Sequence, residues 1–164
     1  MEPEDNRLTY PWFPASDAQS QTYRQDKVAG LEEVVEASRK REVSDKEGSF
    51  MIVRREDRVP VGKIRYFNLN LLNRTAEIGY LANPAEQRKR CAWEGLTLFA
   101  RFLFEKLDLN KIYAPTGAFN KASVALLHSL SFHQDATLRE HQLYNGELHG
   151  DSIFSLLRRE YEQK

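Results

Sequence analysis

The spacing of apolar residues changes abruptly near residue 90, and this change restricts the chain to a mixed fold. From residue 92 to residue 107 the apolar side chains follow the 3.6-residue period of a helix with one buried face. They are Ala92, Leu96, Phe99, Ala100, Leu103 and Leu107. Between residues 49 and 82, runs rich in β-branched and aromatic residues are typical of strands instead. The sequence therefore predicts a long core helix that follows a set of strands.

Three strand segments precede the long helix. Residues 49–55 and 59–71 are separated by a polar turn, Arg55-Glu56-Asp57-Arg58. A third strand is predicted over residues 74–82, after the Leu72-Asn73 connection. Because strands joined by such short connections pair with their neighbours in opposite directions, the three segments are expected to form an antiparallel meander.

Shorter elements lie on either side of these segments. Residues 30–40 carry apolar side chains at near-helical spacing among charges, which predicts an amphipathic helix before the strands. After the long helix the pattern predicts a strand over residues 111–115, a helix over 121–130 and a strand over 131–138. Asn145-Gly146 is a strong hairpin signal, and an apolar strand over residues 152–157 follows it.

The length of the chain favours a single domain over residues 1–164. A chain of this length buries a sizeable core without disulfides or metals. Residues 1–28 are polar and rich in turn formers, which predicts an irregular N-terminal segment. That segment holds no long apolar run, so neither a signal peptide nor a membrane span is expected in it. We therefore expect a cytoplasmic protein.

Charge and cysteine content argue against several classes of partner. The 24 basic and 24 acidic side chains cancel, so no overall field attracts nucleic acid or an anionic membrane. Cys91 is the single cysteine, which excludes an internal disulfide and a multi-cysteine zinc site. The four histidines form no pair at helical metal spacing. We therefore expect no nucleic-acid, membrane or metal partner.

Short motifs between residues 49 and 160 follow one another in an order that is found in a known family. The first are Val61-Gly62-Lys63-Ile64, Ala76-Glu77-Ile78-Gly79-Tyr80 and Leu107-Asp108-Leu109-Asn110-Lys111-Ile112. The later ones are Asn120-Lys121-Ala122-Ser123, Leu130-Ser131-Phe132, Leu138-Arg139, and Gly146 with Asp151. In this order they resemble the GNAT N-acetyltransferases, in particular the branch that acetylates ribosomal-protein N-termini.

The resemblance implies a GNAT-like α/β fold with a mixed, mostly antiparallel sheet of six or seven strands and helices on both faces. It also implies an enzyme, a monomer or homodimer, that uses acetyl-CoA as co-substrate and a primary amine as acceptor. A protein N-terminus, a polyamine and an amino-sugar nucleotide all present such an amine. A GNAT-like domain that has lost turnover and only binds a ligand or partner is the alternative from another class.

The cofactor loop of this family is altered in the chain. The family pattern is Gln/Arg-x-x-Gly-x-Gly/Ala, and the chain has Gln87-Arg88-Lys89-Arg90-Cys91-Ala92, with arginine where glycine is expected. A helix N-terminus suits a pyrophosphate, and glycines let the backbone approach it closely. Side-chain clamps by Arg88, Lys89 and Arg90 can replace part of that contact. We expect residues 87–92 to bind the cofactor; a solvated charge run is the alternative.

Glu77 is the candidate general base. Strand alternation puts Glu77 and Gly79 on one face, and Ile78 and Tyr80 on the other. An attacking amine must lose a proton, and a carboxylate in a partly dry cleft can accept it, often through water. The resemblance places Glu77 near the acyl group. The alternative is a half-exposed strand residue without a catalytic role.

The resemblance also implies a cofactor contact further along the same strand. Family members splay two strands at this place and dock the pantetheine arm along the exposed edge. The backbone of Leu81, Ala82 and Asn83 is therefore expected to bind that arm. Gly79 is expected to leave room for a ligand to approach the backbone.

Asn120 and Ser123 form the third candidate group, at the start of the second helix. Asn120 is a preferred N-cap residue, so helix initiation alone explains its presence. In the family, the matching asparagine also hydrogen-bonds the cofactor arm, and the matching serine lies near its sulfur. Ser123 is therefore the candidate that protonates or hydrates the departing thiolate. The tyrosine that many GNAT enzymes carry one turn further on is Leu127 in this chain.

Overall fold

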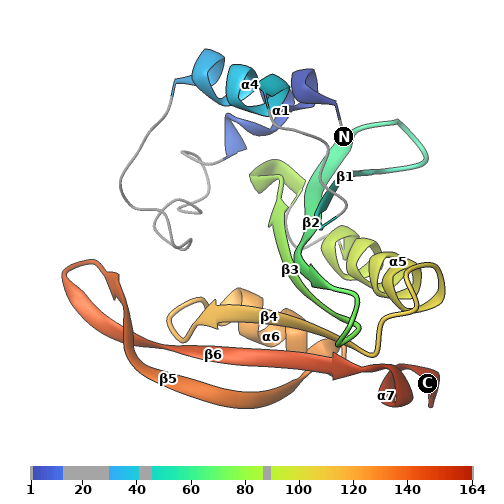
Figure 1. Ribbon diagram of the computed structural model, residues 1–164. Helices are drawn as coiled ribbons and strands as arrows, with labels where there is room; N and C mark the ends of the chain where they lie inside the picture. The colour runs from blue at the N-terminus through green and yellow to red at the C-terminus, as the bar shows by residue number, and fades with distance from the viewer. Residues whose placement is uncertain (1, 13–29, 41–45, 87–89, 164) are drawn as a thin grey trace.

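In the computed structural model six strands form one sheet in the order β1-β2-β3-β4-β6-β5 (Figure 1). The structure describes residues 2–12, 30–40, 46–86 and 90–163. The strands are β1 (Gly48–Val53), β2 (Pro60–Asn70), β3 (Thr75–Ala82), β4 (Lys111–Gly117), β5 (His133–Tyr144) and β6 (Glu147–Leu157). All neighbouring strands are antiparallel except the parallel pair β3 and β4. The predicted mixed, mostly antiparallel sheet is confirmed.

The long helix packs its apolar stripe on one face of the sheet. This helix is α5 (Cys91–Glu105), close to the predicted range of 92–107. Its buried side chains Leu96, Phe99 and Leu103 share one core with Ile64 of β2 and Ile78 of β3. Helix α6 (Lys121–Ser129) contributes Leu127 to the same core. Since alternate strand residues point to opposite faces, the even-numbered residues of β3, and those of β2 as far as Tyr66, face α5. Beyond the register shift that follows Phe67, Leu69 enters the same core.

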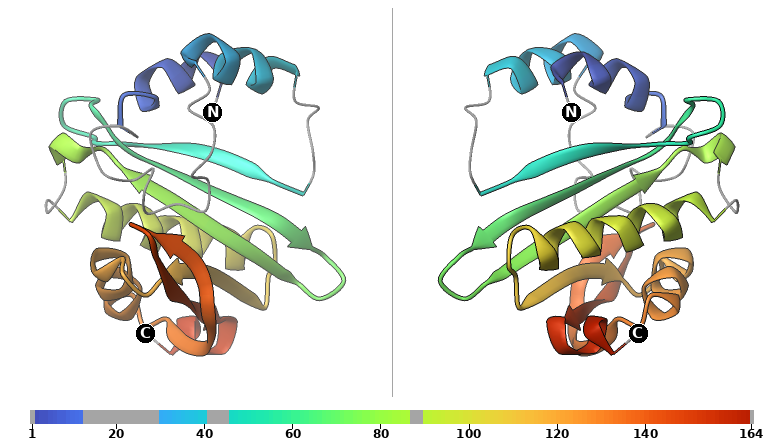
Figure 2. Two further views of the ribbon diagram at one scale, coloured as in Figure 1. Left: turned by 90° about the vertical axis from the view of Figure 1, so that its left-hand side faces the viewer. Right: turned by 90° about the vertical axis from the view of Figure 1, so that its right-hand side faces the viewer.

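The opposite face of β2 meets a layer of N-terminal helices. These are η1 (Pro3–Asp5), α1 (Asn6–Thr9) and α4 (Leu31–Lys40), which lie on the far side of β1 to β3 from α5 (Figure 2). Lys63 Nζ on β2 donates to Asn6 Oδ1 at 3.2 Å, and Asn6 Nδ2 donates to Ser38 Oγ at 3.1 Å. Buried Asn6 therefore ties both helices to the sheet. Helices on both faces, as predicted, are confirmed.

The expectation of an irregular segment over residues 1–28 is wrong for residues 3–9, which are helical. Pro3 occupies the first turn of η1, where its missing N–H is harmless. The Glu2 N–H donates to Asp5 Oδ2 at 2.8 Å and so closes that turn. This helix is too short to show a hydrophobic period, so the sequence pattern gave no sign of it. Residues 13–29 lie outside the described part of the chain.

The C-terminal hairpin is longer than its sequence pattern indicates. Asn145 and Gly146 form the predicted turn, with φ angles of 51° and 82°, as a type I′ turn requires. Strand β5 runs on to Tyr144, beyond the predicted end at residue 138. Its first nine residues are all exposed, and its register shifts between Leu138 and Gln142, so no alternation marks it. Helix α7 (Arg158–Glu162) follows β6 and was not predicted.

Gly95 in α5 lets the helix pack closely against Ile52 of β1. A Cβ atom at this position would lie 2.5 Å from Cδ1 and 3.0 Å from Cγ1 of Ile52. We expect Gly95→Ala to lower the free energy of unfolding by about 1 kcal/mol, because the overpacking outweighs the better helix propensity of alanine. Chemical denaturation measures this change. In an Ile52→Ala background the same substitution should stabilise instead; a loss there too would contradict the steric explanation.

Candidate active site

Strands β3 and β4 pair over three positions and then separate. The pairs are Thr75 with Lys111, Ala76 with Ile112, and Glu77 with Tyr113. Both strands lie wholly within the described ranges. Strand β3 continues to Ala82 and β4 to Gly117, and beyond these three pairs the two strands do not pair with each other. In Figure 1, β1 to β3 rise steeply while β4 to β6 run across the view. The sheet is therefore open between β3 and β4, and Glu77 stands at the narrow end of the opening.

Pro115 explains part of this separation. The Lys111 N–H donates to the Arg74 carbonyl at 3.1 Å, so the backbone groups of Lys111 point toward the β3 side. Because backbone direction alternates along a strand, Tyr113 and Pro115 point to the same side. Proline has no N–H to donate. Beyond the last pair, Pro115 is the first β4 residue whose backbone faces β3, and it cannot donate a hydrogen bond to that strand.

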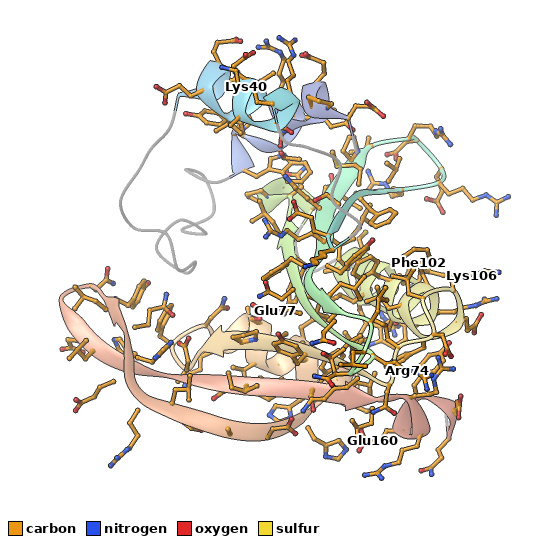
Figure 3. All side chains as sticks on the ribbon, viewed as in Figure 1. Lys40, Arg74, Glu77, Phe102, Lys106 and Glu160 are labelled. Carbon is orange, nitrogen blue, oxygen red and sulfur yellow. The ribbon has the colours of Figure 1, made fainter. Side chains whose placement is uncertain are left out.

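Glu77 projects from the sheet face opposite α5. Its neighbour Ile78 points into the core, so the side chain of Glu77 points to the other face of the strand. Figure 3 shows Glu77 on the far side of β3 from Phe102 of α5. Asn68 Nδ2 donates to Glu77 Oε2 at 2.8 Å. Burial raises the pKa of Tyr113, as do the negative charge of Glu77 and a hydrogen bond to it. Glu77 is thus a partly buried carboxylate held by an amide and a phenol.

Three hydroxyl groups meet on the other face of the opening. Tyr80 Oη on β3 lies 2.5 Å from Ser123 Oγ on α6. Thr116 Oγ1 on β4 lies 3.3 Å from the same Ser123 oxygen. Burial raises the pKa of Tyr80 to about 12, although its hydrogen bond with Ser123 acts in the opposite direction. Ser123 therefore stands between the two diverging strands, and Glu77 lies on the opposite face.

Asn120 caps the helix that carries Ser123. Its Oδ1 accepts the Ser123 N–H at 3.1 Å, so it is the N-cap of α6, as its residue type predicts. The cap orders the first turn of the helix, where Ser123 lies. Asn120 therefore holds Ser123 in place, whether or not it also binds a cofactor.

The three predicted backbone contacts on β3 point in different directions. The Asn83 N–H donates to the Val61 carbonyl at 2.9 Å, so the backbone groups of Asn83 face β2. By alternation the backbone of Leu81 also faces β2, while Ala82 and Tyr80 face the opening. Ala82 and Tyr80 are therefore better placed than Leu81 or Asn83 to meet a ligand between the strands.

Gly79 serves the packing of side chains. A Cβ atom at this position would lie 3.3 Å from Phe67 Cε1 and 3.8 Å from Arg65 Cγ. The Arg65 guanidinium carbon lies 4.2 Å from the centroid of the Phe67 ring. Side chains of β2 therefore fill the space above Gly79, and the expectation that it leaves room for a ligand is wrong.

The altered loop leads into α5 through a left-handed residue. Arg90 has φ 60° and ψ −4°, the conformation that glycine adopts most readily. Its guanidinium carbon lies 5.5 Å from the centroid of the Trp93 ring, and its side chain makes no capping hydrogen bond to the helix. Cys91 and Ala92 are partly buried and begin the helix. Gln87, Arg88 and Lys89 lie outside the described residues.

A short helix before this loop is fixed by an ion pair. It is η2 (Pro84–Glu86), which follows β3 directly. Arg54 Nη1, from the β1–β2 hairpin, lies 2.5 Å from Glu86 Oε2. Arg54 also binds Asp57 and holds the pKa of that carboxyl down to about 2. The hairpin thus anchors the start of the loop.

Four residues of this site were not singled out from the sequence: Tyr80, Thr116, Asn68 and Tyr113. The alternation of residues 74–82 offered a signal for Tyr80, because a tyrosine on the buried face of a strand needs a partner for its hydroxyl. No comparable signal exists for Asn68 or Tyr113. They meet Glu77 only through the register of three strands.

Within the described ranges, no group of three or more histidine, cysteine, aspartate or glutamate side chains is arranged to hold a metal ion. None of the helices described there is long and apolar enough to cross a membrane.

Comparison with known proteins identifies the family. A family model for the acetyltransferase (GNAT) domain matches residues 1–133. The chain belongs to the GNAT acetyltransferase family. This confirms the resemblance inferred from the motifs.

Two curated GNAT relatives come from Bacillus species. The chain is 34% identical over 112 residues to the uncharacterized N-acetyltransferase p20 of Bacillus licheniformis. This match covers 68% of this chain and 63% of that protein. The chain is 31% identical over 101 residues to the putative ribosomal N-acetyltransferase YdaF of Bacillus subtilis. This match covers 62% of this chain and 55% of that protein. The matches thus span less than two thirds of either relative.

Solved structures share the GNAT fold over nearly the whole chain. A spermidine N-acetyltransferase from Vibrio cholerae, in complex with CoA and spermine, superposes with a TM-score of 0.90. The superposition covers 99% of this chain and 95% of that one, at 21% sequence identity. At this identity the likeness shows the fold alone.

The backbone of Arg90 can be tested with two variants that both remove its guanidinium from Trp93. We expect Arg90→Gly to melt at a higher temperature than Arg90→Val, because a β-branched residue is strained at positive φ and glycine is not. The difference should correspond to about 1 kcal/mol or more. Thermal unfolding of both variants measures it. Equal melting temperatures would mean that residue 90 is not held in the left-handed conformation.

Proposed function

We propose that the protein is an N-acetyltransferase that transfers the acetyl group of acetyl-CoA to a primary amine by direct attack within one ternary complex. In this reaction the amine nitrogen bonds to the acetyl carbon, the carbon–sulfur bond breaks, and its electron pair stays on sulfur. The amine must lose a proton and the sulfur must carry a negative charge. The site therefore needs a base for the amine and hydrogen-bond donors for the sulfur.

The observation that carries the proposal is the position of Glu77 and Ser123 on opposite faces of one opening in the sheet. Glu77 stands at its narrow end, on the face away from α5. Ser123 stands on the α5 face, against Tyr80 and Thr116. An amine that arrives beside Glu77 and a thiolate that leaves beside Ser123 do not compete for the same space. This arrangement suits direct transfer better than a shuttle through an acyl-enzyme.

The cofactor path that we propose follows the edge of β3 to the start of α5. A helix N-terminus carries about half a positive charge and N–H groups that have no partner within the helix, which suit a pyrophosphate, and α5 has 15 residues. Arg90 supports this assignment, since at a position where glycine is expected it adopts a left-handed conformation, which glycine takes up most readily. Cys91 and Ala92 are expected to offer backbone N–H groups, and Gln87, Arg88 and Lys89 to add charge and hydrogen bonds. Ala82 and Asn120 are expected to bind the pantetheine arm.

The acceptor that we propose is a primary amine, either a protein N-terminus or a small amine. The name of the Bacillus subtilis relative points to a ribosomal protein, whereas the Vibrio cholerae structure holds spermine. An amino-sugar nucleotide presents the same nucleophile. The site chemistry at Glu77 serves all three, because in each acceptor the nitrogen must give up protons to become an amide.

The direct test combines acetyl-CoA with a panel of amines. The panel holds a peptide with a free N-terminus, spermidine and an amino-sugar nucleotide, and the readouts are thiol release and the mass of the acetylated product. We expect thiol release that depends on one class of amine. Tight binding of acetyl-CoA without thiol release for any amine would favour the alternative, a domain that binds and does not turn over.

The proposed role of Glu77 as general base is tested by removing its charge. We expect Glu77→Gln to leave acetyl-CoA affinity nearly unchanged and to lower kcat by roughly 10²-fold, with a smaller loss at high pH, where more of the amine is already deprotonated. Asn68→Gly is the matched control, because it keeps the carboxylate, removes its amide donor and suits the left-handed backbone of residue 68 (φ 51°), so its loss should be smaller. Unchanged turnover of Glu77→Gln would remove this residue from the mechanism.

Asn120 separates helix capping from cofactor binding. Asn120→Ala should lower the free energy of unfolding by about 1 kcal/mol and also weaken acetyl-CoA binding. Asn120→Asp keeps the capping oxygen and loses the amide hydrogens, so it should retain stability and lose affinity. Thermal unfolding and calorimetric titration measure the two effects. If Asn120→Asp binds acetyl-CoA as tightly as the parent, the residue is only a cap.

A further inference from the structure

The proposed function assigns no role to the hydroxyl of Tyr80, which lies against Ser123. Among the described residues, Ser123 Oγ has two hydroxyl neighbours, Tyr80 Oη at 2.5 Å and Thr116 Oγ1 at 3.3 Å. The Ser123 N–H is already bound to Asn120. Tyr80 and Ser123 are brought together from β3 and from α6, 43 positions apart in the chain. Their contact therefore bridges the two sides of the opening.

The direction of this hydrogen bond decides what Ser123 can do. A serine hydroxyl has a single hydrogen, so if it donates to Tyr80 it has none left for a substrate. A phenol is far more acidic than an alkyl alcohol, so it is the better donor and the poorer acceptor of the two. Burial keeps the pKa of Tyr80 at about 12, so the phenol stays protonated at neutral pH. The difference in acidity therefore favours Tyr80 as the donor and Ser123 as the acceptor.

Resting on the proposed acetyl transfer, we propose that Tyr80 is a positioning residue that donates its phenolic hydrogen to Ser123 and thereby leaves the Ser123 hydrogen free for the sulfur of departing coenzyme A. Neither Tyr80 nor Ser123 gives up its proton in this step. The carbon–sulfur bond breaks, its electron pair remains on sulfur, and the Ser123 hydroxyl donates a hydrogen bond to the new thiolate. The proton that the amine loses goes to Glu77 and from there to water. The thiolate takes a proton from water after release.

A purely structural Tyr80 would behave differently. Its hydroxyl would then matter for stability, because a buried tyrosine needs a partner, and its loss would be felt whether or not Ser123 is present. A Tyr80 that acts through Ser123 affects kcat only when Ser123 carries its hydroxyl. The two explanations are therefore distinguished by a pair of substitutions made separately and together.

The first test uses Tyr80→Phe, Ser123→Ala and the double variant, with the best amine of the panel. We expect Tyr80→Phe to lower kcat about tenfold, with the KM for acetyl-CoA changed less than about twofold, since one hydrogen bond to the leaving group is lost. In the Ser123→Ala background it should cause no further loss of kcat. Tyr66→Phe is the matched control: Tyr66 lies on the neighbouring strand β2, on the same face of the sheet as Tyr80, and stacks on Phe99. The kcat of this variant should stay at the parental value.

The second test changes the acidity of the phenol and keeps its shape. A difluorotyrosine placed at position 80 alone has a more acidic hydroxyl than tyrosine, so it becomes a phenolate at lower pH. A phenolate must accept the Ser123 hydrogen, so kcat should fall on the alkaline side at a lower pH than in the parent. This new alkaline limb should be absent when Ser123 is alanine.

The outcomes separate the two proposals. Turnover in the parent with an unchanged kcat for Tyr80→Phe, or with equal losses in both Ser123 backgrounds, overturns the role of Tyr80 and leaves acetyl transfer standing. An unshifted alkaline limb in the difluorotyrosine variant does the same. No turnover in the parent with any amine overturns both proposals.

Discussion

The parallel contact between β3 and β4 holds the two halves of the sheet together over only three residue pairs, and the rest of the site depends on where it stops. It ends at Glu77 and Tyr113. The next β4 residue whose backbone faces β3 is Pro115, which has no N–H to donate. Beyond that point β3 stays paired with β2, and β4 with β6. Each half thus keeps its own strand pairing beyond that point, and the backbone of Ala82 is left facing the gap.

The two faces of this opening differ in chemistry because strand residues alternate. On one face Glu77 is held by Asn68 and Tyr113. On the other face Tyr80 reaches Ser123 over a core that α5 and α6 cover. A single residue shift in the register of β3 would exchange the two faces. The buried side chains of Ala76 and Ile78 therefore fix the side on which the carboxylate stands, as well as the core.

The two helices beside the opening begin in different ways. The first N–H groups of any helix lack partners within the helix. In α6 the Asn120 side chain satisfies one of them, and this fixes the turn that bears Ser123. At the start of α5 the side chain of Arg90 lies over Trp93 and caps nothing, while its backbone takes a left-handed conformation. The start of α6 is thus capped by the Asn120 side chain, whereas the Arg90 side chain does not cap the start of α5.

The sequence by itself determined the elements, because hydrophobic period and turn chemistry are local. It predicted α4, the β1 to β3 meander, α5, the Asn145-Gly146 turn and the cap at Asn120. It also assigned Glu77 to the face opposite Ile78, since that follows from alternation alone. Tertiary structure decided the partners: Asn68 and Tyr113 beside Glu77, Phe67 over Gly79, and Tyr80 against Ser123. These contacts join separate elements, and their distances depend on strand register and on the place where Pro115 ends the pairing. No local pattern in the chain encodes them.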